Sequence, residues 1–145
     1  MLSIAIQIAA TAFEGKNDKG GVPYIMHCLY VMHKVKHLGE LAMVCGVLHD
    51  VIEDCSDSGY NYEYLKLRGI SDEAIKILEL VTHRGEVTYM DYIKALSTHP
   101  IAKAIKMVDL EHNTKVSRLK GLRKKDFERL EKYVIAYQYL KDLKN

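Results

Sequence analysis

The chain alternates between segments in which apolar residues recur every three or four positions and short polar segments that contain glycine, lysine and aspartate. An apolar repeat with this spacing is typical of one buried face of an α-helix. It predicts helices over 2–13, 23–36, 40–52, 62–67, 71–82 and 89–97, another that Pro100 opens, and a final one after residue 125. No internal repeat and no strand-like alternation interrupts this order. We therefore expect an all-α fold, a compact helical bundle in which residues 1–145 form a single domain.

Ionisable residues stand at positions that the helical spacing assigns to the core. The apolar stripe of segment 40–52 runs through His49, and the stripe that begins at Ile101 leads on to Asp109. Burying an unpartnered carboxylate costs several kcal/mol, so such residues need a cation or hydrogen bonds. The final helix has an ordinary apolar face, which is expected to comprise Leu130, Tyr133, Val134, Tyr137 and Leu140.

Composition and charge narrow the class of protein. Of 145 residues, 48% are hydrophobic and 28% charged, which is typical of a globular chain, and the net charge of +2 argues against nucleic acid as a partner. The three cysteines form no C-x-x-C pair, so neither a disulfide framework nor a thiolate zinc site is indicated, and a reducing cytoplasm fits best. No segment approaches the roughly 18 apolar residues of a membrane span. A homo-oligomer is compatible with the sequence, but no pattern indicates one.

An unusual crowding of charge follows the third predicted helix. The string His49-Asp50-Val51-Ile52-Glu53-Asp54 contains two pairs of ionisable residues whose members are four positions apart. His49 pairs with Glu53 and Asp50 with Asp54, on adjoining faces of a helix. Negative charges repel one another there and oppose the helix macrodipole, and a bound divalent cation would offset both costs. A solvated acidic turn beside a hydrogen-bonded core histidine is the simpler alternative.

Two further strings favour the cation. Pro23-Tyr24-Ile25-Met26-His27 places an imidazole on the opening turns of the second helix, and Asp109 and Asn113 share one face of a later helix. Imidazole and carboxylate ligands without thiolate suit Mn²⁺, Fe²⁺ or a similar ion better than structural zinc. His112, on the same stripe as Asp109, either orients a ligand from behind or is simply a packed histidine.

The order of these motifs resembles a known family. The pattern H…HD…D is similar to that of HD-superfamily phosphohydrolases, and P-Y-I-x-H, L-H-D-V-x-E-D and K-x-x-D-x-x-H-N resemble the hydrolase domain of RelA/SpoT-type alarmone enzymes and their small single-domain relatives. The resemblance implies an HD-type helical fold. It also implies roles for seven residues: His27, His49, Asp50 and Asp109 as metal ligands, Glu53 and Asp54 beside the attacking water, and Asn113 against the substrate.

The loop before the second helix departs from that family. Asp18 stands where the alarmone hydrolases often carry an arginine that stacks on the base, which leaves the base preference open. Lys19 can still reach a phosphate. In the basic stretch after Asn113, Lys115 and Arg118 are the best candidates for phosphate binding, although a charge cluster of this kind is usually a solvated loop.

The resemblance implies a stand-alone hydrolase with one divalent metal, Mn²⁺ first, with Fe²⁺, Zn²⁺, Co²⁺, Ni²⁺ or Mg²⁺ as alternatives. Its expected reaction removes the 3′-pyrophosphate from guanosine (p)ppGpp-like alarmones of the stringent response through metal-activated water. A second interpretation is a phosphatase for another small nucleotide, such as a nucleoside monophosphate or a phosphorylated dinucleotide. The third is a non-catalytic nucleotide-binding module, which would have no need of Glu53 and Asp54.

Overall fold

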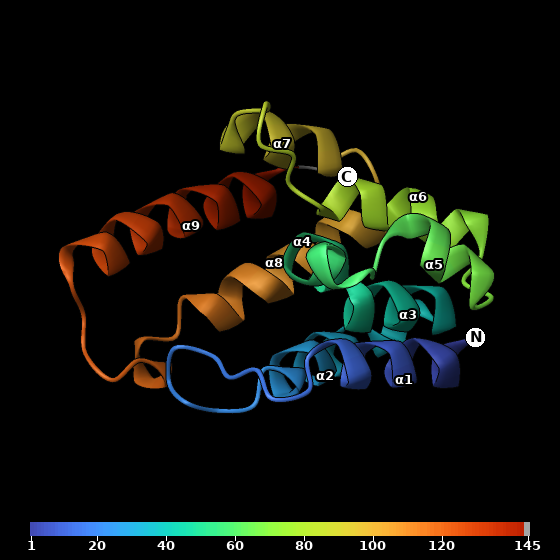
Figure 1. The fold of residues 1–145 in the computed structure, drawn as a ribbon. Coiled ribbons are helices and arrows are strands. Elements are labelled where there is room, and N and C mark those ends of the chain that lie inside the picture. The colour runs from blue at the N-terminus through green and yellow to red at the C-terminus, as the bar shows by residue number, and fades with distance from the viewer. Residues whose placement is uncertain (144–145) are drawn as a thin grey trace.

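The computed structural model describes residues 1–143, and its architecture within that range is a helical bundle (Figure 1). The helices are α1 (Leu2–Ala12), α2 (Ile25–Lys34), α3 (Glu40–Leu48), α4 (Val51–Cys55), α5 (Tyr62–Leu67), α6 (Asp72–Val81), α7 (Tyr89–Leu96), α8 (Pro100–Asn113) and α9 (Lys124–Asp142). Three short 3-10 turns, η1 (Lys36–Leu38), η2 (Ser56–Ser58) and η3 (Val116–Arg118), join some of them. The predicted all-α fold is confirmed. None of the helices in this range combines the length and the apolar character needed to span a bilayer.

Helix α3 is the centre of the bundle. It packs against α1, α2, α6 and α8, and the side chains of Ala42, Val44, Val47 and Leu48 are fully buried. A helix covered on every side must be apolar on every side, which explains why this segment carries almost no polar residue. Gly46 lies where α3 approaches α2 closely, and a Cβ there would press on the backbone of Met32 in α2.

The starts of several helices follow from the residues that precede them. Asn61, Ser71 and Thr88 each accept a hydrogen bond in their side chain from the backbone amide three residues later, the usual N-cap arrangement. Pro100 occupies the first turn of α8, where its missing amide costs no hydrogen bond. The predicted beginnings of α5, α6, α7 and α8 are therefore confirmed.

The predicted helix 40–52 is wrong in one respect, because the chain breaks it at His49 and Asp50. Helix α3 ends at Leu48 and α4 begins at Val51. Asp50 has φ −103° and ψ −3°, a turn conformation that redirects the backbone while the Asp54 amide still donates to the Asp50 carbonyl at 3.0 Å. The sequence does not indicate this break, because the apolar spacing continues without interruption to Ile52. Its consequence is that His49 and Asp50 project from a bend instead of a continuous helix.

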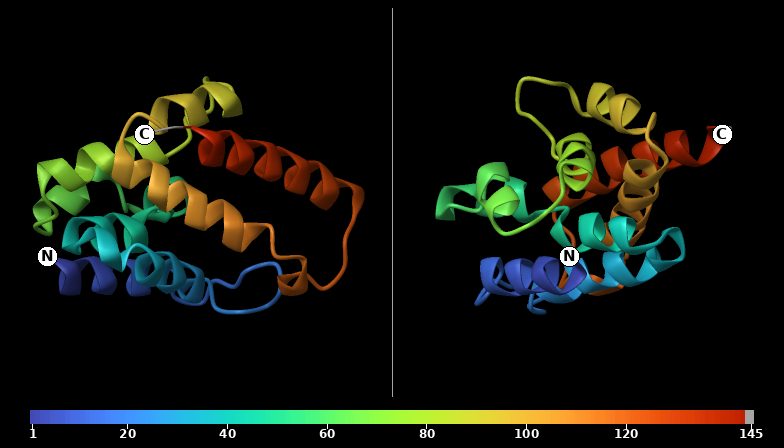
Figure 2. Two further views of the ribbon diagram at one scale, coloured as in Figure 1. Left: turned by 180° about the vertical axis from the view of Figure 1, so that it is seen from behind. Right: turned by 90° about the vertical axis from the view of Figure 1, so that its right-hand side faces the viewer.

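The C-terminal helix α9 lies beside α8, which separates it from α2 and α3 (Figures 1 and 2). Only a narrow face of α9 is covered, with Ala136 and Leu140 fully buried. The predicted apolar face is therefore wrong at Val134, whose exposed fraction is 54%. The face was predicted too wide because apolar residues also occur on the outer side of this helix.

Candidate functional site

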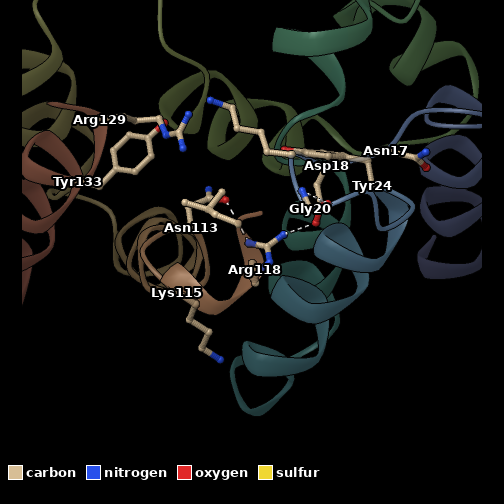
Figure 3. Close-up of a pocket in the computed structure, with 11 residues that line it drawn as sticks. Asn17, Asp18, Gly20, Tyr24, Asn113, Lys115, Arg118, Arg129 and Tyr133 are labelled. Carbon is tan, nitrogen blue, oxygen red and sulfur yellow. Dashed lines mark hydrogen bonds and ion pairs between the residues drawn. The ribbon is translucent and has the colours of Figure 1, made fainter. Parts of the chain in front are cut away.

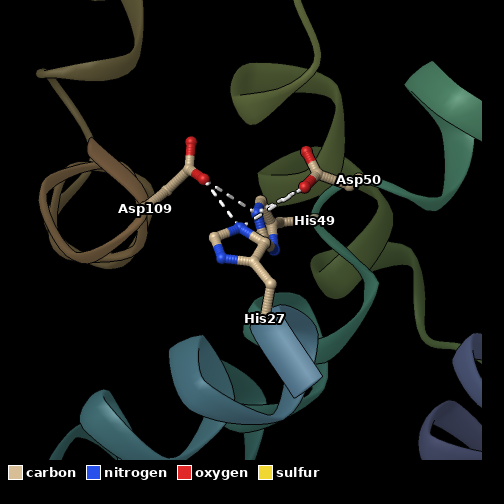
Figure 4. Close-up of side chains that lie close together, drawn as sticks. All are labelled: His27, His49, Asp50 and Asp109. Atoms are coloured by element: carbon tan, nitrogen blue, oxygen red, sulfur yellow. Dashed lines mark hydrogen bonds and ion pairs between the residues drawn. The ribbon is translucent and has the colours of Figure 1, made fainter. Parts of the chain in front are cut away.

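Four side chains from three parts of the chain converge at one point (Figure 4). His27 comes from α2, His49 and Asp50 from the bend between α3 and α4, and Asp109 from α8. One donor atom of each lies within 4.8 Å of all the others. Both imidazoles and Asp109 are buried, and the Asp50 side chain is 15% exposed. We call this group the four-residue cluster.

The spacing of the donor atoms fits a single metal ion. His27 Nε2 lies 2.9 Å from Asp109 Oδ1 and 3.6 Å from Asp50 Oδ2, and His49 Nε2 lies 3.0 Å from Asp50 Oδ2 and 3.3 Å from Asp109 Oδ1. Neighbouring ligands of an octahedral ion with bonds of about 2.1 Å lie about 3 Å apart. Two neutral imidazoles and two carboxylates also neutralise a divalent charge. The cluster could therefore hold a metal ion.

Hydrogen bonds behind the imidazoles orient their Nε2 atoms toward the cluster. The Nδ1–H of His49 donates to the Gly46 carbonyl at 2.7 Å, which turns Nε2 toward the cluster. His27 Nδ1 lies 2.7 Å from His112 Nδ1, and the His112 ring stacks on Tyr30 with centroids 3.9 Å apart. Of the two interpretations of His112, the structure favours the one in which it orients a ligand.

The two carboxylates are held as firmly as the imidazoles. The Tyr24 hydroxyl donates to Asp50 Oδ2 at 2.6 Å, the Lys106 ammonium to Asp109 Oδ2 at 2.9 Å, and the Asn113 amide to Asp109 Oδ1 at 2.8 Å. Lys106 also lies 5.4 Å from the centre of the Tyr92 ring. These contacts fix the direction of each carboxylate before any cation binds, which reduces the cost of assembling the site.

The cluster perturbs the ionisation of its own members. Burial alone would raise the pKa of Asp109, but Lys106, His27 and His49 hold it well below its ordinary value. Burial would likewise raise the pKa of Asp50, and His49 lowers it. Both acids are therefore ionised near neutral pH, the state in which a carboxylate binds a cation.

Glu53 and Asp54 lie on α4, shortly after the cluster residue Asp50, and both are exposed. Glu53 Oε1 accepts a hydrogen bond from the His83 amide at 2.8 Å, which ties α4 to the segment after α6. Burial, together with the charges of Asp50 and Glu53, raises the pKa of Asp54 to about 6. A carboxylate with such a pKa can accept and release a proton close to neutral pH.

A cavity of about 260 Å³ adjoins the cluster, and we call it the inner cavity (Figure 3). Two of its lining residues, Tyr24 and Asn113, also donate hydrogen bonds to cluster carboxylates. The full lining comprises Asn17, Asp18, Lys19, Gly20, Tyr24, Asn113, Lys115, Arg118, Leu119, Arg129 and Tyr133. The four residues that the sequence analysis singled out for substrate contact, Lys19, Asn113, Lys115 and Arg118, are thus brought together around one cavity.

Two lining residues on the final helix were not predicted to belong to a site, since Tyr133 was assigned to the apolar face of that helix and Arg129 was given no role. Arg129 and Tyr133 stand one helical turn apart on α9 and lie across the inner cavity from Asp18 and Tyr24 (Figure 3). Their spacing of four was visible in the sequence, yet it looked like the ordinary edge of an amphipathic helix. Only the packing of α9 against α8 shows that this edge faces the cavity.

The Asp18 side chain stabilises the loop in which it lies. Its Oδ1 accepts hydrogen bonds from the backbone amides of Gly20 at 2.8 Å and Val22 at 2.9 Å, and its Oδ2 accepts one from Arg118 at 2.9 Å. Burial would raise its pKa, but these hydrogen bonds together lower it. The structure therefore explains the aspartate at this position as a folding requirement of the loop.

Arg118 links that loop to the end of α8. Besides the contact with Asp18, its guanidinium donates to the His112 carbonyl at 2.9 Å and approaches Asn113 Oδ1 at 3.4 Å. Gly20 packs so closely on the Arg118 backbone that an added Cβ would overlap its carbonyl oxygen. Arg118 thus holds one wall of the inner cavity in place and, through Asn113, reaches the cluster.

Comparison with known proteins finds relatives in both sequence and structure. A GTP pyrophosphokinase of Streptomyces coelicolor is 30% identical over an alignment 125 residues long. The alignment covers 79% of this chain but only 14% of the length of that protein. A solved structure described as a metazoan ortholog of SpoT that hydrolyses ppGpp and plays a role in starvation responses matches with a TM-score of 0.74. That match has 18% identity and covers 97% of this chain and 85% of the other. No model of a known protein family matches the chain.

Proposed function

Because this chain has the helical fold of the RelA/SpoT-type hydrolase domains that its motifs resemble, we propose that residues 1–145 are a metal-dependent phosphohydrolase domain. Its proposed reaction removes the 3′-pyrophosphate from guanosine alarmones of the (p)ppGpp type. The observation that carries the proposal is the convergence of two imidazoles and two carboxylates beside a cavity lined with cationic side chains. The cluster supplies the place for the reaction, and the cavity a place for a phosphorylated nucleotide.

In this proposal His27, His49, Asp50 and Asp109 hold one divalent cation, for which we propose Mn²⁺. The absence of a thiolate among these donors supports an ion that prefers nitrogen and oxygen ligands. A cation held there would polarise a phosphoryl oxygen and lower the pKa of a neighbouring water molecule.

Asp54 is proposed to receive the proton of the attacking water. Its pKa of about 6 makes it a base of suitable strength near neutral pH, and its exposed position leaves it open to water. Glu53 shares the same turn, and its hydrogen bond with the His83 amide fixes the direction in which its carboxylate points. We propose that Glu53 orients the water while Asp54 takes the proton.

The lining of the inner cavity supports binding of a nucleotide. Lys19, Lys115 and Arg129 offer cationic donors to phosphate oxygens, and Tyr133 offers a ring on which a base can stack. Asn113 is proposed to contact the substrate, and Arg118 to contribute by holding Asn113 and the Asp18 loop. In this view the base is recognised by α8 and α9.

The test uses purified protein with Mn²⁺, Fe²⁺, Zn²⁺, Co²⁺, Ni²⁺ or Mg²⁺ and follows released pyrophosphate and phosphate separately. Substrates are ppGpp, a nucleoside monophosphate and a phosphorylated dinucleotide. The Asp109→Asn variant serves as the inactive control for contaminating hydrolases, and Asp57→Asn, an exposed carboxylate outside the cluster, as the matched active control.

Pyrophosphate released from ppGpp by the wild type and by Asp57→Asn supports the proposed reaction. Phosphate released from one of the other nucleotides, with ppGpp left intact, would replace it with the phosphatase interpretation. If no substrate is hydrolysed with any ion although ppGpp binds, the chain is a nucleotide-binding module and the proposal is wrong.

A further inference from the structure

The two oxygens of the Asp109 carboxylate have different neighbours. Oδ1 lies 2.9 Å from His27 Nε2 and 3.3 Å from His49 Nε2, so it faces the imidazoles of the four-residue cluster. Oδ2 lies 2.9 Å from the ammonium of Lys106, which stands one turn earlier on α8. The Lys106 side chain is 13% exposed. A largely buried cation is therefore placed on the side of this carboxylate that the imidazoles do not occupy.

The surroundings of Lys106 keep its ammonium at that position. Its Nζ lies 5.4 Å from the centre of the Tyr92 ring and 5.9 Å from that of Tyr89. Aromatic rings attract a cation with their faces and cover the apolar stem of a lysine. Tyr92 is itself fixed, because it is buried and its hydroxyl donates to the Val81 carbonyl at 2.6 Å. Lys106 is thus held beside Asp109 Oδ2 by contacts on more than one side.

A lysine beside a metal site opposes the binding of a cation by its charge, so its position needs a further explanation. A carboxylate can bind a cation through one oxygen or through both. Ions of the Mn²⁺ type take about six ligands, so the four protein donors leave about two positions for water and substrate oxygens. If Asp109 bound through both oxygens, it would occupy one of those positions. A donor that engages Oδ2 prevents this.

We propose that Lys106 is a positioning residue that restricts Asp109 to a single metal contact, through Oδ1, and thereby keeps one coordination position open for water or a phosphoryl oxygen. The proposal rests on the proposed function for the presence of the ion. Asp109 Oδ1 also accepts from the Asn113 amide at 2.8 Å, which leaves this oxygen one lone pair for a cation. Lys106 acts through Asp109 and contacts neither the ion nor the substrate.

The test counts the water molecules on protein-bound Mn²⁺ by water relaxation, a measurement that needs no turnover. The variant Lys106→Met keeps an unbranched apolar stem between the tyrosines and removes the ammonium. The matched control is Lys132→Met, because the Lys132 ammonium also lies over the Tyr89 ring, at 4.6 Å, but belongs to an exposed side chain of α9. Circular dichroism confirms that both variants are helical.

The wild type and Lys132→Met are expected to keep about two water molecules on the ion and Lys106→Met about one, because Asp109 Oδ2 is then free to bind. Turnover by Lys106→Met should fall roughly 10- to 100-fold, which is typical for loss of a group that orients a ligand. Lys106→Arg retains a cationic donor and should keep the wild-type water number. The same number in Lys106→Met as in the wild type, or an equal decrease in Lys132→Met, would overturn the proposal.

A second measurement needs no substitution of Lys106, in case its variants do not fold. Infrared spectra distinguish a carboxylate that binds a cation through one oxygen from one that binds through two, by the separation of its two stretching bands. Wild-type protein with isotope-labelled aspartate is expected to show only the one-oxygen form when Mn²⁺ binds. A two-oxygen band that persists in Asp50→Asn would belong to Asp109 and would contradict the proposed role of Lys106.

The outcome is separable from that of the proposed function. If the water number falls in Lys106→Met but ppGpp is not hydrolysed by the wild type, only the hydrolase proposal fails. If ppGpp is hydrolysed and the water number does not depend on Lys106, only the role of Lys106 fails. If the wild type binds no Mn²⁺ or related ion, both proposals are wrong.

Discussion

The Tyr24 hydroxyl donates a 2.6 Å hydrogen bond to Asp50 Oδ2, and through this bond the wall of the inner cavity is joined to the four-residue cluster. Tyr24 is held in turn by the Phe13 ring, with centroids 4.8 Å apart. Burial and the charge of Asp50 raise the pKa of Tyr24, so the hydroxyl keeps its proton and remains a donor. The contact therefore serves to direct a carboxylate without adding a charge.

Removing that hydroxyl should weaken the binding of a cation. Tyr24→Phe is expected to lower Mn²⁺ affinity about tenfold, because groups that orient a ligand typically contribute that much, while the ring contact with Phe13 is retained. Calorimetric titration with Mn²⁺ measures the effect. Tyr139→Phe removes a hydroxyl from α9 and should bind Mn²⁺ like the wild type. Unchanged affinity in Tyr24→Phe would show that Asp50 does not need this bond.

Acid should remove the contribution of Asp18 to stability. Its folded pKa is lowered, so its stabilisation is present above the unfolded value of about 3.9 and is lost as the pH falls through and below that value. At pH 7 the Asp18→Asn variant is expected to lose about 1 kcal/mol in urea unfolding. The difference from the wild type should shrink below pH 4. A difference that does not shrink as the pH falls below 4 would assign it to causes other than charge.

Two glycines offer a matched test of the loop packing. Gly20→Ala should destabilise the protein by about 1–3 kcal/mol, because its Cβ overlaps the Arg118 carbonyl oxygen and must push η3 away. A Cβ at Gly85 meets no atom within 4 Å, so Gly85→Ala should change stability by no more than about 0.5 kcal/mol. Urea unfolding measures both. Similar values for the two variants would contradict the close contact.

The two acids on α4 should be needed for turnover but not for metal binding. Glu53→Gln and Asp54→Asn are each expected to reduce kcat by at least about 100-fold, since proton transfer and its orientation typically contribute that much. Mn²⁺ affinity should stay within a few-fold of the wild type, because neither residue belongs to the four-residue cluster. Release of pyrophosphate from ppGpp gives the rate, and calorimetry gives the affinity. Full activity in Glu53→Gln would refute its proposed role.

Much of the fold could be predicted because its signals are local. Apolar spacing located the helices, and short side chains such as Ser71 mark where they start. The break at His49 and Asp50 could not be predicted, because the apolar stripe continues across it to Ile52 and only the tertiary position of the cluster requires the bend.

The candidate site likewise has one part that could be predicted from the sequence and one part that could not. Ionisable residues at core positions indicated a site near His49 and Asp109, because the cost of burying charge is a property of each residue. The full set of four ligands came from the resemblance of the motifs to those of HD-superfamily phosphohydrolases. The inner cavity depends instead on which face of α9 packs against α8, a long-range property. Arg129 and Tyr133 were therefore not predicted to line it, and neither was the contact between Asp18 and Arg118, which are 100 positions apart in the chain.

His27 and Asp109 are 82 positions apart in the chain, yet their donor atoms lie 2.9 Å from each other. A cation shared between them would act as a crosslink between the N-terminal and C-terminal parts of the bundle, and its binding energy would add to the free energy of unfolding. Amide hydrogen exchange in α2 and α8 would then slow together when the ion binds. Binding of an ion at this one site would thus reduce motion in helices that lie far apart along the chain.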